Sequence, residues 1–297
     1  MKLAEFDSWM RAEAELVEVA LQRWVPDDAP AGLGHAMRYG VLDGGKRVRP
    51  LLVLAAAQAV HGLPEAAMRA ACAVELIHAY SLVHDDMPCM DNDVLRRGKP
   101  TVHVQFGEAQ AMLAGDAMQA LAFEVLTPDE SPEMPAALQA RLCSLLARSA
   151  GYKGMAGGQA IDLASIGQPL GEHALRDMHH RKTGALLQAS VLMGAACGQA
   201  TPAQWSALAD YGDALGLAFQ VVDDILDVTQ ASATLGKTAG KDIDNNKPTY
   251  VTVLGLDAAR RHATELRDMA QAALARSGLP DAAWLSLLAD KVVERES

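Results

Sequence analysis

Two groups of aspartates, each at the end of an apolar stretch, are the residues best suited to chemistry in this chain. The first lies in LVHDDMPCMD and the second in FQVVDDILD. Carboxylates crowded in this way repel one another, so we expect a bound cation to offset the repulsion. Oxygen ligands without nearby Cys or His pairs favour Mg²⁺, which completes its shell with water and substrate phosphates. The candidate metal ligands are Asp85, Asp86, Asp91, Asp223 and Asp227.

The spacing within each group predicts how its carboxylates are arranged. Asp223 and Asp227 are four residues apart, so they share one face of a helix. Pro88 interrupts the first group, because proline lacks the amide donor and disfavours helix at the preceding residue. We therefore expect Asp91 to turn back towards Asp85 instead of continuing along a regular helix. A solvated helix end or a capping role is the alternative for one group alone, and the presence of two groups disfavours it.

Short basic runs accompany the acidic groups, although the formal net charge of the chain is −11. The runs are GGKRVRP, LRRGKP, HHRKTG and a Lys-rich segment after the second acidic group. One run alone is more typical of a solvated surface. Together they indicate a diphosphate site, because guanidinium groups and lysine amines are the usual donors to phosphate oxygens. The runs supply Lys46, Arg47, Arg49, Arg96, Arg97, Lys99, Arg181, Lys182, Lys237, Lys241 and Lys247.

His78 lies in ELIH, which matches the Glu-x-x-His element of di-iron helical bundles. Such bundles carry two copies of this element, and we find a single copy in the sequence, so a di-iron centre is disfavoured. A core position is the alternative for a lone helical histidine. The neighbouring acidic and basic groups favour a diphosphate contact.

Helical periodicity runs through almost the whole chain without sustained period-two alternation, which predicts an all-α fold. Half of the 297 residues are apolar, so one domain over residues 1–297 can bury a large core. No segment is typical of an interdomain linker, although the polar stretch 229–249 is long enough to act as a lid. The predicted helices cover residues 3–24, 31–43, 50–61, 65–87, 104–126, 134–151, 172–197, 202–228 and 257–275, with a short helix near the C-terminus.

Composition argues against several classes of protein. The acidic net charge disfavours a general nucleic-acid binder, which normally presents a basic face. No uninterrupted apolar run reaches the ~18 residues that suggest a membrane span, so we expect no stable membrane insertion. The N-terminus lacks the apolar core of a signal peptide, and the four cysteines form no CxxC pair, which is typical of a reducing compartment. These features predict a cytoplasmic protein.

With its motifs in this order, the chain resembles the trans-isoprenyl diphosphate synthases, most closely the bacterial farnesyl diphosphate synthases. The resemblance extends from GGKRVRP at 44–50 to NNKPTY at 245–250 and includes DDxxxxD followed by DDxxD. It implies an isoprenoid-synthase-type helical bundle around a deep central cavity, usually in a homodimer. It also implies Mg²⁺-dependent, head-to-tail condensation of isopentenyl diphosphate with dimethylallyl and geranyl diphosphate, which gives (2E,6E)-farnesyl diphosphate in isoprenoid biosynthesis.

The same resemblance implies a role for each motif residue. Three Mg²⁺ ions would be held by Asp85, Asp91 and Asp223, with support from Asp86, Asp224 and Asp227. The allylic diphosphate would be bound by Arg96, Lys182, Lys237 and Lys247. Isopentenyl diphosphate would be bound by Lys46, Arg49, His78 and Arg97. The catalytic group would comprise Lys182, Thr183, Gln220 and Lys237, of which Thr183 and Gln220 favour the developing cation between the substrates.

Two residues before the first aspartate motif bear on product length. In the family the growing chain runs along this helix, where Tyr80 and Ser81 lie roughly 6–7.5 Å below Asp85 at about 1.5 Å per residue. Ser81 is small enough to let the chain pass, whereas Tyr80 is bulky enough to form a floor. This arrangement favours a C15 product over a C10 or C20 product, with ordinary helix packing as the alternative for Tyr80.

Three alternatives are weighed against this interpretation. A geranyl or geranylgeranyl diphosphate synthase would differ in product length alone. A class I terpene cyclase normally carries an Asn/Ser/Glu pattern where this chain has DDILD. A non-catalytic regulatory subunit would typically lack metal or basic residues, and the motifs show no such loss. One departure is Pro248 beside Lys247, where many relatives have Ser or Thr, and it leaves the orientation of that lysine open.

Overall fold

Within the part of the chain that the structure describes, the regular structure is helical apart from one hairpin of two-residue strands, which confirms the all-α prediction. The computed structural model describes residues 3–42, 44–168, 170–229 and 249–295. Its elements are α1 (Leu3–Trp24), a 3-10 turn (Pro30–Gly32), α2 (Leu33–Val41), α3 (Val48–Ala59), α4 (Pro64–Asp85), β1 (Leu95–Arg96), β2 (Lys99–Pro100), α5 (Val102–Phe106), α6 (Glu108–Leu126), α7 (Ala136–Ala150), α8 (Met155–Ala164), α9 (Glu172–His179), a π-helical segment (His180–Gly184), α10 (Ala185–Ala196), α11 (Pro202–Thr229), α14 (Tyr250–Leu254), α15 (Leu256–Ser277) and α16 (Ala283–Val293).

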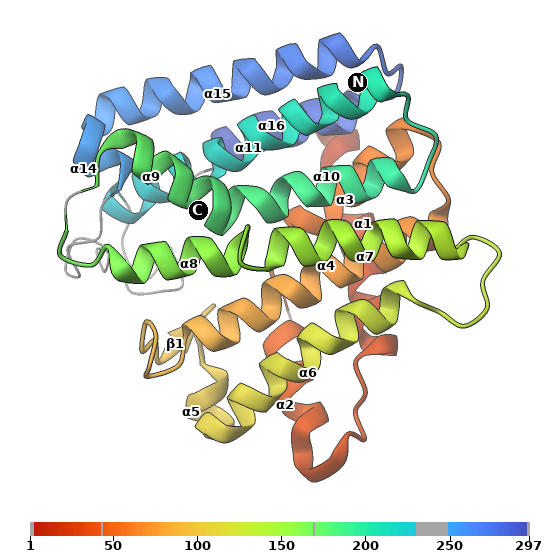
Figure 1. The fold of residues 1–297 in the computed structure, drawn as a ribbon, viewed down its shortest axis with the longest axis vertical. Coiled ribbons are helices and arrows are strands. Elements are labelled where there is room, and N and C mark those ends of the chain that lie inside the picture. Colours follow the sequence, from red (N-terminus) through yellow and green to blue (C-terminus); the bar gives the residue numbers. More distant parts are fainter. Residues whose placement is uncertain (1–2, 43, 169, 230–248, 296–297) are drawn as a thin grey trace.

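Two long helices, α4 and α11, carry the two aspartate motifs. α4 has Pro64 in its first turn, where the missing amide donor has no cost, and it ends at Asp85, shortly before Pro88. α11 runs unbroken for 28 residues and carries DDILD in its last turns. In Figure 1 both helices run towards the left-hand side, where the β1 hairpin, α9 and α14 also lie. The fold therefore brings the acidic ends of two helices to one end of the bundle.

α4 lies at the centre of the bundle and packs against α3, α6 and α10. Its alanines approach neighbouring helices closely, and most of its side chains from Ala66 to Val83 are buried. Among the described residues α4 is the one helix that passes a length and hydropathy test for a membrane span. However, 72% of its most apolar window is buried inside the protein, and the core helix of a globular domain passes the same test.

Several predicted boundaries were wrong. The helix expected over 104–126 is two helices, α5 and α6, which separate at Gly107. The helix expected over 172–197 is interrupted by the π-helical segment between α9 and α10. The sequence analysis assigned no helix to 155–164, because the small residues of MAGGQAIDLA hide the apolar stripe of α8. It also missed α14 and the β1–β2 hairpin.

His180 fastens the π-helical segment to α11, and this contact predicts a pH-dependent stability. Its Nδ1 lies 2.7 Å from Asp213 Oδ1, and the hydrogen bond to Asp213 raises the pKa of His180 above 6.5. A raised histidine pKa stabilises the fold below the unfolded-state pKa, and this contribution is lost as pH rises through the folded-state pKa. Both side chains are more than one third exposed, so we expect less than about 1 kcal/mol.

Thermal unfolding between pH 6 and pH 9 tests this contact. The melting temperature of the unmodified chain should fall by about 1–3 °C more than that of His180→Gln over this range. Equal slopes for the two proteins would contradict the assignment.

Candidate functional site

A cavity of about 1040 Å³ opens between α4, α8, α11 and the loop that precedes α3. Of the predicted site residues, it is lined by Lys46, Arg49, His78, Tyr80, Ser81, Asp85, Asp91, Arg96, Arg97, Lys182, Thr183, Gln220, Asp223, Asp224 and Asp227. Asp86 lies behind the rim. Lys237 and Lys247 fall outside the described residues. Segments far apart in the sequence therefore meet around one space.

The first aspartate motif curls back after α4, as Pro88 predicted. The Asp91 amide donates to the Asp85 carbonyl oxygen at 2.8 Å, and this turn brings Asp91 to the cavity beside Asp85. Burial raises the pKa of Asp85 to about 6, and Lys182 is the charged neighbour that opposes this shift most. The Asp85 carboxylate therefore pays an energetic penalty in the ligand-free chain that a bound cation would relieve.

Asp86, next in the sequence, is turned away from the cavity lining. Both of its carboxylate oxygens accept hydrogen bonds from Arg96, at 2.6–3.0 Å. The Asp86 side chain is 3% exposed. This forked pair fixes the orientation of Arg96 at the cavity rim, which favours the supporting role for Asp86 over direct metal contact.

The three aspartates of the second motif all line the cavity but differ in exposure. Asp224 is buried, and its Oδ2 accepts the Tyr250 amide at 2.7 Å, which ties α11 to α14. Asp223 lies at the cavity, and its Oδ1 accepts from Arg295 Nη2 at 2.9 Å. Asp227 also lines the cavity, one turn along from Asp223.

On the side formed by the loop before α3, the groups suit an anion. Arg49 lines the cavity and is 9% exposed, and burial lowers its pKa to about 10. Its Nε is buried and has no hydrogen-bond partner among the residues that the structure describes. Burial, followed by the charge of Arg49, holds the pKa of His78 well below 6.5, so His78 is neutral. Lys46 and Arg97 complete this group of cavity-lining side chains.

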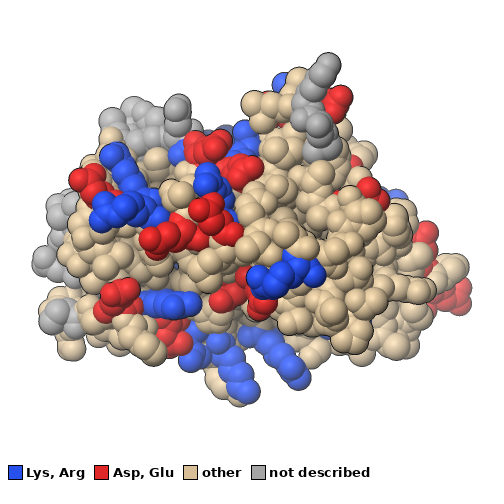
Figure 2. Space-filling view, turned by 90° about the horizontal axis from the view of Figure 1, so that it is seen from above, with Lys and Arg blue, Asp and Glu red and all other residues tan. Residues whose placement is uncertain are grey.

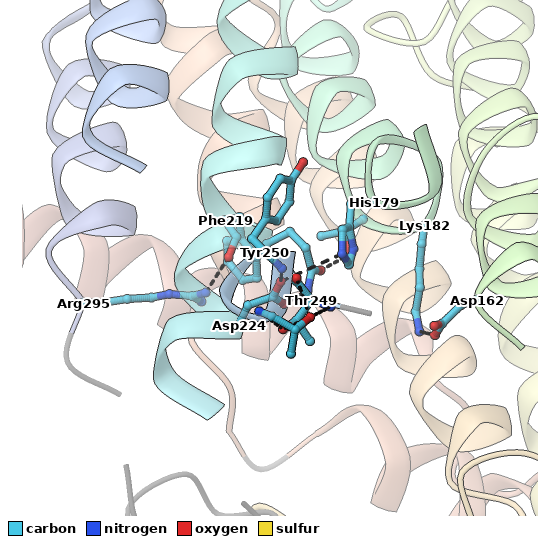
Figure 3. Close-up of polar contacts among 11 residues, drawn as sticks. Asp162, His179, Lys182, Phe219, Asp224, Thr249, Tyr250 and Arg295 are labelled. Atoms are coloured by element: carbon cyan, nitrogen blue, oxygen red, sulfur yellow. Dashed lines mark hydrogen bonds and ion pairs between the residues drawn. The ribbon is translucent and has the colours of Figure 1, made fainter. Parts of the chain in front are cut away.

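Lys182 is placed by a close approach between α8 and the π-helical segment. A Cβ on Gly158 would lie 2.2 Å from the Lys182 backbone nitrogen, so only glycine permits this packing. Asp162 comes one turn after Gly158 on the same face of α8. Its Oδ2 lies 2.5 Å from Lys182 Nζ, as Figure 3 shows.

Thr183 and Gln220 are placed by a second close approach, between the π-helical segment and α11. A Cβ on Gly216 would lie 2.6 Å from the Gly184 Cα. One turn further along α11, Gln220 Oε1 accepts from Thr183 Oγ1 at 2.9 Å, and Gln220 Nε2 donates to Asp224 Oδ1 at 2.8 Å. A carboxylate only accepts hydrogen bonds, so Asp224 fixes which way the Gln220 amide faces. The Thr183 and Gln220 oxygens are thereby held at the cavity wall.

Tyr80 and Ser81 line the part of the cavity along α4. The Tyr80 ring packs edge-on against His84, with centroids 5.7 Å apart, and its hydroxyl bonds to Gln119 of α6. Ser81 has a small side chain, and its hydroxyl donates to the His78 carbonyl oxygen at 2.9 Å.

The donor set fits magnesium that binds together with a diphosphate. Among the described residues, no three His, Cys, Asp or Glu side chains converge as a ready-made metal site. Mg²⁺ is usually held by one or two carboxylates, with substrate phosphates and water completing its shell. Asp85, Asp91 and Asp223 offer such carboxylates from two helices around one cavity. The penalty on ionised Asp85 is a second feature that a cation would remove.

Three residues near the site were missed by the sequence analysis: Asp162, His179 and Arg295. The one signal in the sequence that could have identified Asp162 is that it is an isolated acid among small and apolar residues. His179 is buried, burial lowers its pKa to about 4, and its ring stacks on Tyr250 at 5.4 Å. Arg295 stacks on Phe219 with its guanidinium carbon 3.9 Å from the ring centroid. Figure 3 shows Arg295 and Lys182 approaching the site from opposite sides.

Charges of both signs are interspersed on one face of the molecule. On the face shown in Figure 2, Lys and Arg side chains lie beside Asp and Glu side chains, without a broad basic patch among the described residues of that face. A nucleic-acid interface would instead present a continuous basic surface.

Comparisons with known proteins agree with this geometry. A sequence model described as polyprenyl synthetase matches residues 30–279. The chain is 48% identical over 266 residues to geranylgeranyl pyrophosphate synthase 12, chloroplastic, of Arabidopsis thaliana, which covers 89% of this chain and 74% of that protein. It is 42% identical to the farnesyl diphosphate synthase of Geobacillus stearothermophilus over 98% of both chains.

A solved structure with the same fold is that of a geranyltransferase from Helicobacter pylori, complexed with magnesium and isoprenyl diphosphate. Its TM-score to this chain is 0.83 at 34% identity, and the match covers 96% of this chain and 95% of that chain. The Arabidopsis and Geobacillus enzymes are named for products of different length, so similarity alone does not assign a product to this chain.

Proposed function

This chain belongs to the polyprenyl synthetase family of prenyl diphosphate synthases, and from that premise we propose that it makes (2E,6E)-farnesyl diphosphate. It would condense isopentenyl diphosphate first with dimethylallyl diphosphate and then with geranyl diphosphate. The observation that carries this proposal is the meeting of both aspartate motifs and the described basic runs around one cavity.

The residues at the cavity divide between the two substrates. Arg96 and Lys182, beside the aspartates, would bind the allylic diphosphate, and Lys237 and Lys247 are proposed to assist from outside the described residues. The isopentenyl diphosphate would be bound by Lys46, Arg49, His78 and Arg97. Bound Mg²⁺, held by Asp85, Asp91 and Asp223, would supply positive charge against the departing diphosphate; we propose three ions, with Asp86, Asp224 and Asp227 in support.

The proposed reaction breaks the allylic carbon–oxygen bond, and diphosphate leaves with the bonding electrons. Arg96 and Lys182 stabilise the charge that develops on the leaving group. The Thr183 and Gln220 oxygens, fixed by their mutual hydrogen bond, direct their negative ends at the allylic cation. The isopentenyl double bond then forms the new carbon–carbon bond, and a proton passes to the released diphosphate. Exclusion of water from the cavity during the reaction would protect the cation.

In this proposal one residue on α4 sets the product length. Tyr80, held by His84 and Gln119, would stop chain growth at C15 after the chain has passed Ser81. The competing candidate is a geranylgeranyl diphosphate synthase, which the identity to the Arabidopsis enzyme favours. A homodimer and a cytoplasmic location are also part of the proposal, and that plant relative is named as chloroplastic.

A product analysis tests both the activity and the floor. Purified protein is incubated with Mg²⁺, isopentenyl diphosphate and dimethylallyl diphosphate, and the dephosphorylated products are separated by length. We expect mainly farnesol, and in Tyr80→Ala a shift to C20 or longer products by about tenfold in the C20 to C15 ratio. Tyr152→Ala, at an exposed tyrosine away from the cavity, is the matched control and should give farnesol.

Two other outcomes of the product analysis would change the proposed function in different ways. Geranylgeraniol from the unmodified chain would keep the chemistry and replace the C15 product by the C20 alternative. No Mg²⁺-dependent product from folded protein would favour a non-catalytic subunit of a prenyl diphosphate synthase.

A further inference from the structure

Lys182 is held by a carboxylate that belongs to neither aspartate motif. Its Nζ lies 2.5 Å from Asp162 Oδ2, and the Lys182 side chain is 25% exposed while that of Asp162 is 6% exposed. In Figure 3 the Lys182 side chain extends towards Asp162 and meets its carboxylate. The pair is therefore part of the protein interior and differs from a solvated surface ion pair.

The backbone on both sides of this pair is fixed by packing. Gly158 touches the Lys182 main chain, and a Cβ there would lie 2.5 Å from the Lys182 Cα. Asp162 follows one turn later, so the distance between its Cα and that of Lys182 is set by the contact between two helical segments. The ion pair does not depend on a chance rotamer of a mobile side chain.

The same amine acts on a carboxylate of the first aspartate motif. After burial, which raises the pKa of Asp85 to about 6, Lys182 is the largest influence on it and the strongest positive one. Both side chains line the same cavity. Lys182 thus contacts Asp162 on α8 and lines the same cavity as Asp85 at the end of α4.

We propose that Asp162 is a positioning residue that holds the Lys182 amine on the α8 side of the cavity and so keeps the Asp85 carboxylate available to a divalent cation. This inference rests on the proposed metal site. Without the charge of Asp162, a partly buried ammonium group needs another partner, and Asp85 is a carboxylate of the aspartate motifs that lines the same cavity. An ammonium group paired with Asp85 would compete with the cation for the same oxygens.

A double-mutant cycle separates this role from two simpler ones. The two simpler roles for Asp162 are binding the metal itself and attracting it from a distance. In either case the loss of Asp162 has the same effect whether or not Lys182 is present. If Asp162 acts by restraining Lys182, its loss has an effect only while Lys182 is present. The cycle comprises the unmodified chain, Asp162→Asn, Lys182→Gln and the double variant.

Mn²⁺ binding in the presence of inorganic pyrophosphate, followed by electron paramagnetic resonance of free Mn²⁺, gives a readout independent of catalysis. We expect Asp162→Asn to weaken Mn²⁺ binding by about tenfold, and the double variant to bind within about twofold of Lys182→Gln. An equal loss from Asp162→Asn in both backgrounds would overturn the proposal. Failure of the unmodified chain to bind Mn²⁺ would contradict the proposed metal site and this inference with it.

Asp162→Glu keeps the charge and guards against a loss that merely reflects folding. It should bind Mn²⁺ within about threefold of the unmodified chain, because a glutamate on α8 still offers Lys182 a counter-ion. A tenfold loss in this variant, with an unchanged melting temperature, would show that the charge on α8 is insufficient and would also overturn the proposal.

Discussion

Asp85→Asn is expected to lower kcat/KM by at least about a thousandfold and, in the same protein, to raise the melting temperature without ligands. The activity falls because an amide cannot offer the carboxylate charge that holds the cation against the leaving diphosphate, and a thousandfold corresponds to about 4 kcal/mol. The stability rises because burial raises the pKa of Asp85 to about 6, so the ionised form is disfavoured in the folded chain at neutral pH. Asparagine has nearly the same shape without that charge, which we expect to gain about 1–2 kcal/mol.

Steady-state kinetics at saturating Mg²⁺ and thermal unfolding without Mg²⁺ measure the two effects. Asp116→Asn is the matched control, since Asp116 is exposed on α6 and does not line the cavity. It should change kcat/KM by less than about twofold and stability by less than about 0.5 kcal/mol. An Asp85→Asn protein that kept a tenth or more of the activity would contradict the assignment of Asp85 as a metal ligand.

Opposite changes in activity and stability would identify Asp85 as a group retained for function. Replacing a residue that only supports the fold lowers the stability of the protein. A crowded, desolvated carboxylate instead destabilises the folded chain until its ligand binds. The two measurements together therefore distinguish a metal ligand from a helix cap, which was the alternative for this motif.

Short-range rules predicted the parts of the site that lie within one motif. The position of Pro88 predicted that the chain turns Asp91 back towards Asp85, and the structure has this turn. Helical spacing predicted that Asp223 and Asp227 share one face, and both line the cavity. Both outcomes depend on the backbone of a few consecutive residues, for which proline geometry and the helical repeat suffice.

Contacts between distant segments were not predictable in the same way. Lys182 meets Asp162 across 20 residues, and Arg295 meets Asp223 across 72. Each contact exists because helices pack at a particular distance and angle, which a single sequence does not reveal. Composition also concealed α8, since its small residues, which permit close approach to the π-helical segment, hide its apolar stripe.

Arg47 illustrates the same limit within a single motif. The sequence grouped it with the basic residues of GGKRVRP, but its side chain is 3% exposed and points into the protein. Its Nη1 lies 2.5 Å from Glu75 Oε1 and its Nη2 lies 2.5 Å from Glu18 Oε2, and Nη2 also donates to the Val41 carbonyl oxygen at 2.7 Å. Arg47 thus joins the loop to α1, α2 and α4.

Arg47→Met is therefore expected to lower the free energy of unfolding by about 3–5 kcal/mol, because it leaves the Glu75 carboxylate buried without its counter-ion. Denaturant unfolding measures the change, and Arg276→Met is the matched control. Arg276 pairs with Asp210 at 2.8 Å, yet both side chains are more than half exposed, so the expected loss is below about 1 kcal/mol. Similar losses in the two variants would show that Arg47 is an ordinary surface cation.

The Arg47 variant should also weaken the binding of isopentenyl diphosphate more than that of the allylic substrate. Arg47 has φ of 48°, and its inward side chain fixes the turn from which Lys46 and Arg49 reach the cavity. Loss of the anchor frees this turn, while Arg96 and Lys182 keep their own partners, Asp86 and Asp162. At a temperature where the variant is folded, we expect KM for isopentenyl diphosphate to rise by about tenfold and KM for the allylic substrate by less than about twofold. An equal rise in both would mean that Arg47 supports the whole fold without a particular effect on this half of the site.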